Sequence, residues 1–590
     1  MGDYVPSDVV SEEALAAFLH GQELEDIGDL PSALEIYQDV CASSAAASAM
    51  PFDCSLPFRT VSPPLPLVVS MALNSLGGAH LDAGRIPMAR TAFTKSLRLW
   101  ASNGMSLMNL GDLERSHGCQ DKALAFYERA AALKPLGKSR QPEWVESWLA
   151  TPRIECVALA SCMCILMLHQ RDCFDAALPY LRRFNSEYRI APAVWRLVND
   201  VSGGRREPAR IAAPDERVYR YADAVPLPLL ATLKQAFAPG AAFWAETNYV
   251  AGSYYSFYFD VRQAPSNAVE QLALTLLPLT GCAERIAGVS WWAHSKPAFS
   301  SIGHQLHFDT EERTLAATGE VLHPAVTTVC YLQEGVAGAD GPHAAGQAAS
   351  SPTIVYDQRL PDCAVGAQGA SVAHVAHPMV DTVLFYPGDR LHCVCPAAPS
   401  RPPPPRPCRK RTRSTRGAGS PSSGTAEDSD GEQPDGTEPR DNGESLEAQV
   451  TAAARITLMI SFWTRALGPK DMPASMRRAA PSGVCAAVPR ATRACSWPRS
   501  LNIPDVLRAK GDSKSTAAES PDHPRGPRRL AVTEVVNPWQ RLAPLSPACD
   551  DAAGRSHEHD PWHGLVVPAE RDTHFFIRSM ADLRGCFGNE

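Results

Sequence analysis

Residues 455–463 read Arg-Ile-Thr-Leu-Met-Ile-Ser-Phe-Trp, and this stretch decides the architecture expected for the second half of the chain. Successive side chains of a β-strand point to opposite faces, so an alternating pattern assigns each residue to one face. The apolar positions share one face: Ile456, Leu458, Ile460 and Phe462. Arg455 and Thr457 share the other face, where a buried guanidinium needs an anion such as a carboxylate. The stretch predicts a strand that packs on one side and lines a pocket on the other.

The region before this strand also has the composition of short β-strands. Aromatic or β-branched runs with turn signals between them lie at residues 248–259, 285–294, 326–332, 353–356 and 382–386. Pro387-Gly388-Asp389 is a turn signal that leads into the run 390–395. Several short strands separated by turns predict an all-β barrel or sandwich.

A stretch rich in potential metal ligands lies within this β-rich region, at residues 303–309, which read Gly-His-Gln-Leu-His-Phe-Asp. Side chains two positions apart on a strand share a face, so His307 and Asp309 can reach one point, and His392 follows the turn. Two imidazoles and one carboxylate form a facial set typical of ferrous iron, which leaves coordination positions open. Zinc normally takes a closed tetrahedral site, or three ligands and water. His-x-Asp arises often by chance, and the position of Arg455 is what strengthens the interpretation.

These motifs together resemble the 2-oxoglutarate and Fe(II)-dependent dioxygenases. They are His307-x-Asp309, His392 in the setting Pro-Gly-Asp-x-x-His-x-x-x-Pro, and Arg455-x-Thr457. The resemblance covers approximately residues 225–467 and implies a double-stranded β-helix, or jelly roll, with flanking helices. It implies that His307, Asp309 and His392 are the catalytic iron ligands. It also implies that Arg455, assisted by Thr457, holds the distal carboxylate of 2-oxoglutarate.

The resemblance implies Fe(II) as the metal, 2-oxoglutarate and dioxygen as cosubstrates, and ascorbate as an accessory reductant. The expected reaction is hydroxylation of a protein, a peptide or a small molecule, with release of succinate and CO₂. The oxidative demethylases of alkylated nucleic acid share the iron motif but carry a second arginine six residues after the first. Ser461 stands at that position here, which argues against nucleic acid as the substrate.

The spacing between the last two motifs differs from the family pattern. Family members usually carry the arginine about ten residues after the distal histidine, whereas 63 positions separate His392 from Arg455. Residues 397–450 are Pro-rich and basic, then acidic with Gly and Ser, a composition that cannot bury enough apolar surface to fold. We expect a disordered insertion at the tip of a hairpin. Such an insertion is tolerable because loop closure costs only about 0.6 kcal/mol per doubling of length.

The N-terminal third of the chain repeats itself with a period of 34 residues. Each copy has two glycines, an alanine, an aromatic residue and a final small or β-branched residue. The copies are Gly21, Gly28, Ala33, Tyr37 and Val40; Gly77, Gly84, Ala89, Phe93 and Ser96; and Gly111, Gly118, Ala123, Tyr127 and Ala130. This pattern resembles the tetratricopeptide repeat, in which small residues let two antiparallel helices approach and the aromatic residue fills the gap toward the next repeat. A generic bundle of helical hairpins is the alternative.

Helical repeats stack into a concave surface of the kind that binds peptides or proteins, so a protein or peptide partner is expected at residues 1–200. A Pro-rich insert separates the first repeat from the second, and residues 201–224 read as a linker. Residues 468–530 are rich in Ala, Pro, Ser and basic residues and are expected to be mostly disordered. Residues 531–590 have enough apolar content to dock on the jelly roll.

Overall composition excludes some classes of protein. The chain has 590 residues, 45% of them hydrophobic, and a net charge of −8, which gives no electrostatic drive toward nucleic acid or an anionic membrane. The longest apolar run, 156–168, is shorter than a membrane span of roughly 20 residues and predicts a buried helix. The first residues lack the pattern of a secretory signal, and the 17 cysteines are scattered, so a cytoplasmic or nuclear protein is expected.

Several residues outside the main motifs allow two interpretations. His304 is expected to be structural, Cys393 and Cys395 to be packing thiols, and Trp291 and Trp292 to pack in the barrel. Pocket lining and core packing are equally open for a further set: Tyr331, Tyr356, Asp357 and Gln358. The basic run 409–413 is a nuclear localisation signal, a nucleic-acid contact or, more simply, a solvated segment beside the acidic one.

Two rival functions stay open at the level of the whole chain. One is a non-catalytic adaptor, in which helical repeats are joined to a degenerate jelly roll. The other is a cupin-type metal site that does not use 2-oxoglutarate. Arg455 discriminates against the second, because a cupin without this cosubstrate needs no buried guanidinium on that face.

Overall fold

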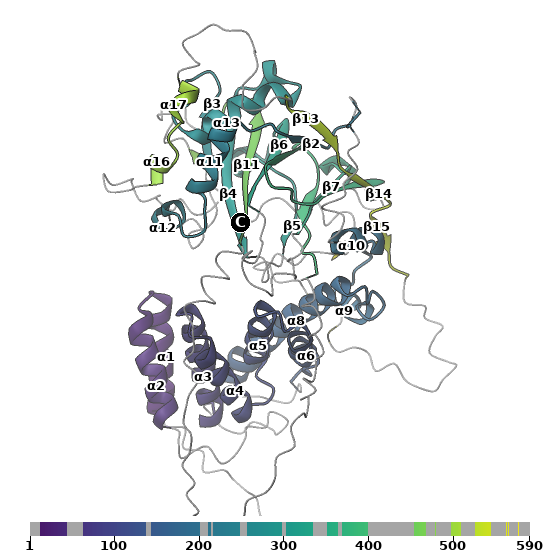
Figure 1. Cartoon of the computed structure of the whole chain (residues 1–590). Coiled ribbons are helices and arrows are strands. Elements are labelled where there is room, and N and C mark those ends of the chain that lie inside the picture. Colours follow the sequence, from purple (N-terminus) through teal and green to yellow (C-terminus); the bar gives the residue numbers. More distant parts are fainter. Residues whose placement is uncertain are drawn as a thin grey trace, which may run out of the picture.

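The structure is a computed structural model, and it divides into a helical region and a sheet region (Figure 1). It describes residues 12–43, 63–136, 143–200, 211–213, 216–247, 256–297, 303–333, 351–363, 369–398, 454–467, 478–479, 497–508, 526–543, 562, 565 and 576–577. The expected insertion at 397–450 lies outside the described residues, apart from its first two positions.

The helical region begins with three antiparallel hairpins. Their helices are α1 (Glu12–Asp26) with α2 (Leu30–Ser43), α3 (Leu65–Asp82) with α4 (Ile86–Leu99), and α5 (Gly104–Ser116) with α6 (Gln120–Ala131). The glycine in each turn has a positive φ, which few other residues adopt: Gly28 at 85°, Gly84 at 70° and Gly118 at 75°. The second glycine of each repeated copy therefore ends the first helix of its hairpin.

The same glycine–aromatic contact holds all three hairpins together. A Cβ atom added at Gly21 would lie 2.6 Å from the ring of Tyr37. The corresponding distances are 2.4 Å for Gly77 and Phe93 and 2.5 Å for Gly111 and Tyr127. Each ring also packs toward the next helices of the stack: Tyr37 on Val68 and Ala72, Phe93 on Leu110 and Leu113. The close approach and the gap filling expected from the repeat are both present.

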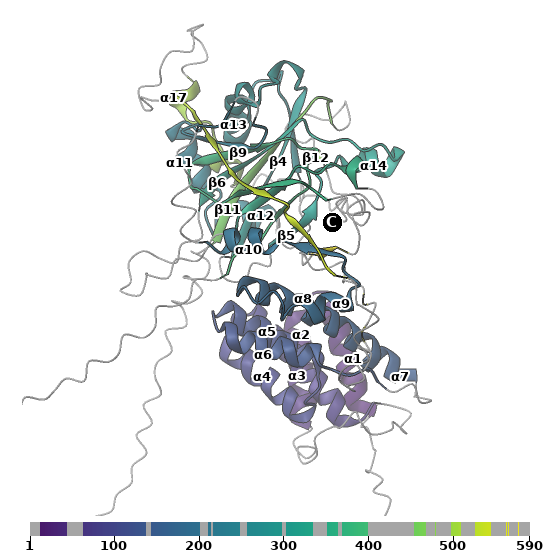
Figure 2. The ribbon, with the colours of Figure 1, turned by 90° about the vertical axis from the view of Figure 1, so that its right-hand side faces the viewer.

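A long apolar helix follows the hairpins. It runs from α7 (Glu143–Val145) through a π-helical turn (Glu146–Ala150) into α8 (Thr151–Gln170), and it lies along the top of the stack in Figure 2. The segment Glu146–Gln170 has the length and composition of a membrane span, but 72% of its apolar window is buried inside the structure. The run 156–168 is therefore a buried helix, as expected. The shorter helices α9 (Leu178–Arg183) and α10 (Pro192–Asn199) complete the region.

The sheet region contains two antiparallel sheets that face each other. The large sheet has the order β12 (Arg478–Ala479), β3 (Ser256–Asp260), β4 (Gly288–Pro297), β11 (Ala454–Trp463), β6 (Val326–Gln333), β9 (Thr382–Tyr386), β2 (Tyr219–Ala222) and β13 (Arg528–Ala531). The small sheet has the order β14 (Thr533–Val536), β8 (Val372–Ala376), β7 (Thr353–Tyr356), β10 (His392–Val394) and β5 (His304–His307). Apolar side chains of both sheets meet between them, among them Val329, Val355 and Leu384.

Helices cover the outer face of the large sheet. The principal ones are α11 (Leu227–Ala236) and α13 (Ala268–Leu276), and the shorter ones are α12 (Ala242–Thr247), α16 (Trp497–Ser500) and α17 (Asp505–Arg508). The helix α14 (Glu312–Thr318) follows β5 and lies away from them in Figure 2. The apolar face of β11 packs on Leu229 and Leu233 of α11 and on Leu272 of α13. The alternation expected along residues 455–463 is therefore observed, with the helices on one side and the inter-sheet space on the other.

One segment near the C-terminus joins all the sheets. Along residues 528–541, β13 pairs with β2 of the large sheet, β14 pairs with β8 of the small sheet, and β15 (Trp539–Arg541) pairs with β1 (Tyr188–Ile190) of the helical region. Figure 2 shows this segment in yellow as it crosses the sheets. β16 (Phe576–Ile577) completes the three-stranded sheet on the other side of β1.

Direct contacts also connect the end of the helical region to the chain that follows β10. The side-chain amide of Gln170 donates to the carbonyl oxygens of Pro396 at 3.0 Å and Ala397 at 3.1 Å. The side-chain oxygen of Asn199 accepts from the backbone N–H of Ala398 at 3.1 Å. The end of β10 is therefore held by residues more than 190 positions earlier in the chain.

Three expectations about connectivity differ from the structure. β10 and β11 belong to different sheets and do not pair, so the segment between them links two sheets rather than extending a hairpin tip. β2 lies inside the range 201–224 that was expected to be a linker, because it pairs with β9 across the sheet. Residues near the C-terminus dock on the helical region as well as on the sheets: the indole of Trp562 donates to the carbonyl of Leu133 at 2.6 Å.

Candidate metal centre

The pairing of two strands in the small sheet brings the predicted ligands together. β10 runs antiparallel to β5, and the register places His392 directly opposite His307. Asp309 lies two residues beyond the last residue of β5. One ligand atom from each of the three side chains lies within 4.8 Å of the other two. The structure therefore assembles His307, Asp309 and His392 into a group that could bind a metal ion, compatible with a site of two histidines and one carboxylate.

The three side chains point their free donor atoms at one another. Nε2 of His307 lies 3.8 Å from Oδ1 of Asp309, and Nε2 of His392 lies 3.6 Å from the same oxygen. The other nitrogen of each ring, Nδ1, bonds a backbone carbonyl: Gln305 at 2.8 Å for His307 and Arg390 at 3.0 Å for His392. A carbonyl can only accept, so Nδ1 carries the proton and Nε2 keeps its lone pair. This tautomer is the one that a metal requires.

A second layer of hydroxyl groups fixes the carboxylate. Thr327 of β6 donates to Oδ2 of Asp309 at 2.7 Å, and its hydroxyl lies 3.2 Å from that of Ser461 on β11. Thr327 and Ser461 are fully buried. The large sheet therefore holds one carboxylate oxygen and leaves Oδ1 to face the histidines.

Burial keeps the imidazoles in the form that binds metal. Desolvation lowers the pKa of His307 well below its ordinary value, and the neighbouring His392 and His304 lower it further. Desolvation also lowers the pKa of His392, although the carboxylate of Asp309 opposes this shift. Nε2 of His392 is buried and has no hydrogen-bond partner among the described residues. A neutral imidazole with a buried, unpaired nitrogen is suited to a metal ligand.

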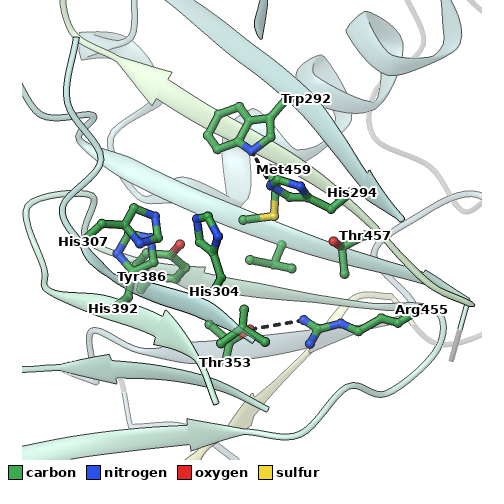
Figure 3. A pocket seen from close by; sticks show the side chains of 12 residues that line it. Trp292, His294, His304, His307, Thr353, Tyr386, His392, Arg455, Thr457 and Met459 are labelled. Atoms are coloured by element: carbon green, nitrogen blue, oxygen red, sulfur yellow. Dashed lines mark hydrogen bonds between the residues drawn. The ribbon is translucent and has the colours of Figure 1, made fainter. Parts of the chain in front are cut away.

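The three ligands lie at one end of a cavity between the sheets. The cavity holds about 540 Å³ of space between protein atoms, including its opening to solvent. Among the described residues it is lined by Trp292, His294, His304, His307, Val329, Thr353, Tyr386, His392, Val394, Arg455, Thr457 and Met459. Figure 3 shows the histidines of the metal centre at one end and Arg455 at the other, with His304 between them.

Arg455 enters the cavity with its guanidinium buried. It donates to the backbone carbonyl of Ser351 and, at 3.5 Å, to the hydroxyl of Thr353. Its guanidinium carbon lies 5.4 Å from the centre of the Tyr331 ring, and burial lowers the pKa of the guanidinium. These described contacts are all with neutral groups, so the cavity carries a positive charge at this end. Thr457, two residues along the same strand, also lines the cavity.

The remaining predicted residues fall into two groups. Cys393, Cys395 and Tyr356 pack in the core between the sheet and helical regions, and Trp291 packs under α11 and α13. His304 lines the cavity, with its ring 4.5 Å from that of His307. Trp292, which we expected to pack only, also lines the cavity and donates to Nε2 of His294 at 3.1 Å. The ring of Tyr331 packs against the guanidinium of Arg455.

Sequence reasoning missed several residues of the site. His294, Thr353, Tyr386 and Met459 line the cavity, and Thr327 positions Asp309. Met459 could have been predicted from the same two-residue alternation that places Arg455 and Thr457 on the cavity face. The other positions could not be assigned to a face, because that requires the pairing of strands far apart in the sequence.

Searches against protein-family models and against curated proteins find no match for this chain. The function of this chain is therefore inferred from the geometry of its site.

Proposed function

We propose that this protein is an Fe(II)- and 2-oxoglutarate-dependent oxygenase that hydroxylates a protein, peptide or small-molecule substrate. The observation that carries the proposal is one cavity with a His–Asp–His group at one end and a buried guanidinium at the other. On this proposal, the two facing sheets form a double-stranded β-helix, and the three hairpins are tetratricopeptide-like repeats.

The donor set fits ferrous iron. His307, Asp309 and His392 would hold the metal through Nε2, Oδ1 and Nε2, which lie within 4.8 Å of one another. Such a set leaves positions open for other ligands, and the bound iron would supply the oxidative chemistry with dioxygen. The protein contributes the ligand geometry, the fixed tautomers and the hydroxyl of Thr327 on Asp309.

The charges in the cavity fit a ligand with two negative charges. Arg455 carries one positive charge and Asp309 one negative charge, and the neutral histidines add none. A divalent cation adds two positive charges, so a dicarboxylate restores neutrality in this buried space, where unbalanced charge is costly. Arg455, with the hydroxyls of Thr353 and Thr457 beside it, would bind one carboxylate, and the metal end would receive the other.

Nonpolar walls support the same assignment. Val329, Val394 and Met459 line the cavity, and Arg455 is its only charged lining side chain in the described part of the chain. A low-dielectric space strengthens the pairing of guanidinium and carboxylate and limits access of water to the metal end. The helical region would bind a protein or peptide partner, either the substrate itself or a scaffold.

An anaerobic titration of the purified protein with Fe(II) and then 2-oxoglutarate tests the proposal. We expect the weak visible charge-transfer band of a metal-bound 2-oxo acid, because this band needs both the metal and its chelating ligand. Arg455→Ala should raise the 2-oxoglutarate concentration required on the order of 10- to 100-fold, the equivalent of about 1.5 to 3 kcal/mol for a charged hydrogen bond. Arg465→Ala is the matched control, since Arg465 is exposed and pairs with Glu320 on the surface.

The outcomes separate the rival functions. Metal binding without the band would favour a cupin-type site that does not use 2-oxoglutarate. Failure to bind metal at all would favour the adaptor. An equal 2-oxoglutarate requirement in Arg455→Ala and wild type would show that another residue binds the distal carboxylate.

A further inference from the structure

Tyr386 occupies a position beside the metal centre that the proposed function does not yet use. It is the last residue of β9, and its side chain lies between the two sheets with 1% of its surface exposed. Its ring centre is 5.0 Å from that of His392, and the side chain lines the cavity. Figure 3 shows Tyr386 next to His307 and His392, at the end of the cavity opposite Arg455.

The hydroxyl of Tyr386 is buried without a hydrogen-bond partner among the described residues. The hydroxyl of Tyr356, which lies outside the cavity, likewise has none among the described residues, whereas three other buried tyrosines do have a partner. The hydroxyl of Tyr331 lies 3.1 Å from that of Thr353, Tyr37 donates to Glu25 at 2.8 Å, and Tyr127 donates to Asp112 at 2.6 Å. An unsatisfied buried donor is costly, so a cavity-lining hydroxyl of this kind points to an acceptor that arrives with a ligand.

The surroundings define the acceptor. Asp309 already uses Oδ2 for Thr327 and faces the histidines with Oδ1. The histidine Nδ1 atoms are used by backbone carbonyls. The acceptor must therefore be an oxygen that enters the cavity at the metal end. The first carboxylate of a dicarboxylate ligand lies at the far end with Arg455, so the second is the oxyanion nearest Tyr386.

We propose that Tyr386 is a ligand-binding residue whose hydroxyl donates a hydrogen bond to the carboxylate that a 2-oxo acid places at the metal end of the cavity. This inference rests on the proposed function, because it takes 2-oxoglutarate as the ligand. A hydrogen bond from a buried phenol to a carboxylate is charge-assisted, and it is made only once the ligand is bound. Tyr386 and Arg455 would then grip opposite ends of one molecule.

The test compares Tyr386→Phe with Tyr356→Phe. Tyr356 is the matched control because it is also fully buried but stacks on Trp539, with ring centres 5.3 Å apart, outside the cavity. Each full-length protein is loaded with Co(II), whose visible spectrum reports on the metal site alone, and is then titrated with 2-oxoglutarate. Tyr386→Phe should bind Co(II) as wild type does and bind 2-oxoglutarate about tenfold more weakly. Tyr356→Phe should match wild type in both titrations.

A second ligand locates the contact. Pyruvate keeps the 2-oxo acid group but lacks the distal carboxylate, so Tyr386→Phe should weaken its binding about as much as that of 2-oxoglutarate. Arg455→Ala should weaken only 2-oxoglutarate. Equal weakening of both ligands by Arg455→Ala would overturn the placement of Arg455 and Tyr386 at opposite ends of the ligand. Unchanged binding of both ligands in Tyr386→Phe would overturn the assignment of Tyr386.

Failure of this inference and failure of the proposed function are distinguishable. Wild-type binding of 2-oxoglutarate with an unchanged Tyr386→Phe variant overturns the role of Tyr386 alone. Absence of 2-oxoglutarate binding to Co(II)-loaded wild type overturns both. If Tyr386→Phe does not fold, ultraviolet difference spectroscopy of the wild type replaces it. Ligand binding should shift the tyrosine absorption of the wild type and shift that of Tyr356→Phe to the same extent. No shift in the wild type would overturn the proposal.

Discussion

The helical and sheet regions assemble their key contacts over different distances along the chain. In the helical region, Gly77 meets Phe93 on the next helix, and the same contact recurs in each hairpin. In the sheet region, Thr327 holds Asp309 from 18 positions away and contacts Ser461 across 134 positions. Local contacts repeat and can be changed one hairpin at a time. The metal centre needs strands of both sheets, because β5 and β10 of the small sheet carry the histidines and β6 of the large sheet holds Asp309.

The largest expected effect tests the metal centre itself. Asp309→Ala removes the carboxylate that faces both histidines, and with it the negative charge that this group brings to the site. Because changes to surrounding residues of metal sites already cost about 10- to 100-fold in affinity, loss of a ligand should cost on the order of 100-fold or more. Fe(II) or Co(II) titration measures it. Retention of metal at wild-type affinity would remove Asp309 from the ligand set.

A smaller effect tests the contact that spans both sheets. Thr327→Val keeps the shape of the side chain but removes the hydroxyl that donates to Asp309. Metal affinity should fall about 10- to 100-fold, since the carboxylate loses its orientation. Thr327→Ser, which keeps the hydroxyl, should restore most of the affinity. Equal affinities in Thr327→Val and Thr327→Ser would show that the hydrogen bond from this position does not determine metal affinity.

The junction of the two regions provides a test through pH. His169 on α8 is fully buried beside Trp195 and Phe174, and its ring nitrogens lack partners among the described residues. Burial, and then the nearby Arg189, lower the pKa of His169 to about 3 from an ordinary value of 6.5. Below pH 6.5 the imidazole of His169 is protonated in the unfolded chain but stays neutral in the folded protein until the pH approaches 3. Stability therefore falls from pH 6.5 toward pH 3, by about 2 kcal/mol at pH 5.

Replacing this histidine should remove that dependence. His169→Leu should flatten the loss of stability between pH 6.5 and pH 5, as measured by urea unfolding at each pH, while metal binding at pH 7 stays unchanged. His80→Leu is the comparison variant, because His80 is also buried and its pKa is also lowered, but its Nδ1 accepts a hydrogen bond from Arg85. An identical pH profile in His169→Leu and wild type would contradict the account.

The smallest effects test the local character of the repeats. Gly77→Ala places a methyl group 2.4 Å from the Phe93 ring, so overpacking should outweigh the gain in helix propensity and destabilise the helical region by about 1 to 2 kcal/mol. Gly78→Ala meets nothing within 4 Å on the same helix and should stabilise it by about 0.5 to 1 kcal/mol. Thermal unfolding followed by circular dichroism measures both. Equal effects of the two variants would mean that the Gly–aromatic contact does not hold the hairpin together.

The same difference in contact distance explains what the sequence could predict. The strands 353–356 and 382–386 are observed at the expected residues, and the two-residue alternation along 455–463 correctly separates the packed face from the cavity face. His307, Asp309 and His392 come together as expected. These features depend on local patterns, or on a motif whose known ligand set already indicates which residues should lie together.

Features that depend on strand pairing were not predictable. The direction of Tyr386 follows from the pairing of β9 with β6 and β2, and no local pattern reveals which face it takes. The link between β10 and β11 crosses from one sheet to another, which a spacing of 63 residues cannot indicate. The segment 528–541 pairs with strands more than 150 positions earlier, and its own sequence does not indicate which strands these are.

The central place of β11 has a consequence for synthesis on the ribosome. β11 lies between β4 and β6, whose sequences are complete at Gln333. Trp463, the end of β11, is added roughly 130 residues later, which at about 5 to 20 residues per second takes roughly 7 to 26 s. During this interval the edges of β4 and β6 lack the strand that pairs with them in the folded protein, and unpaired edges can associate with other chains. A chaperone that shields them on the nascent chain should therefore raise the yield of correctly folded protein.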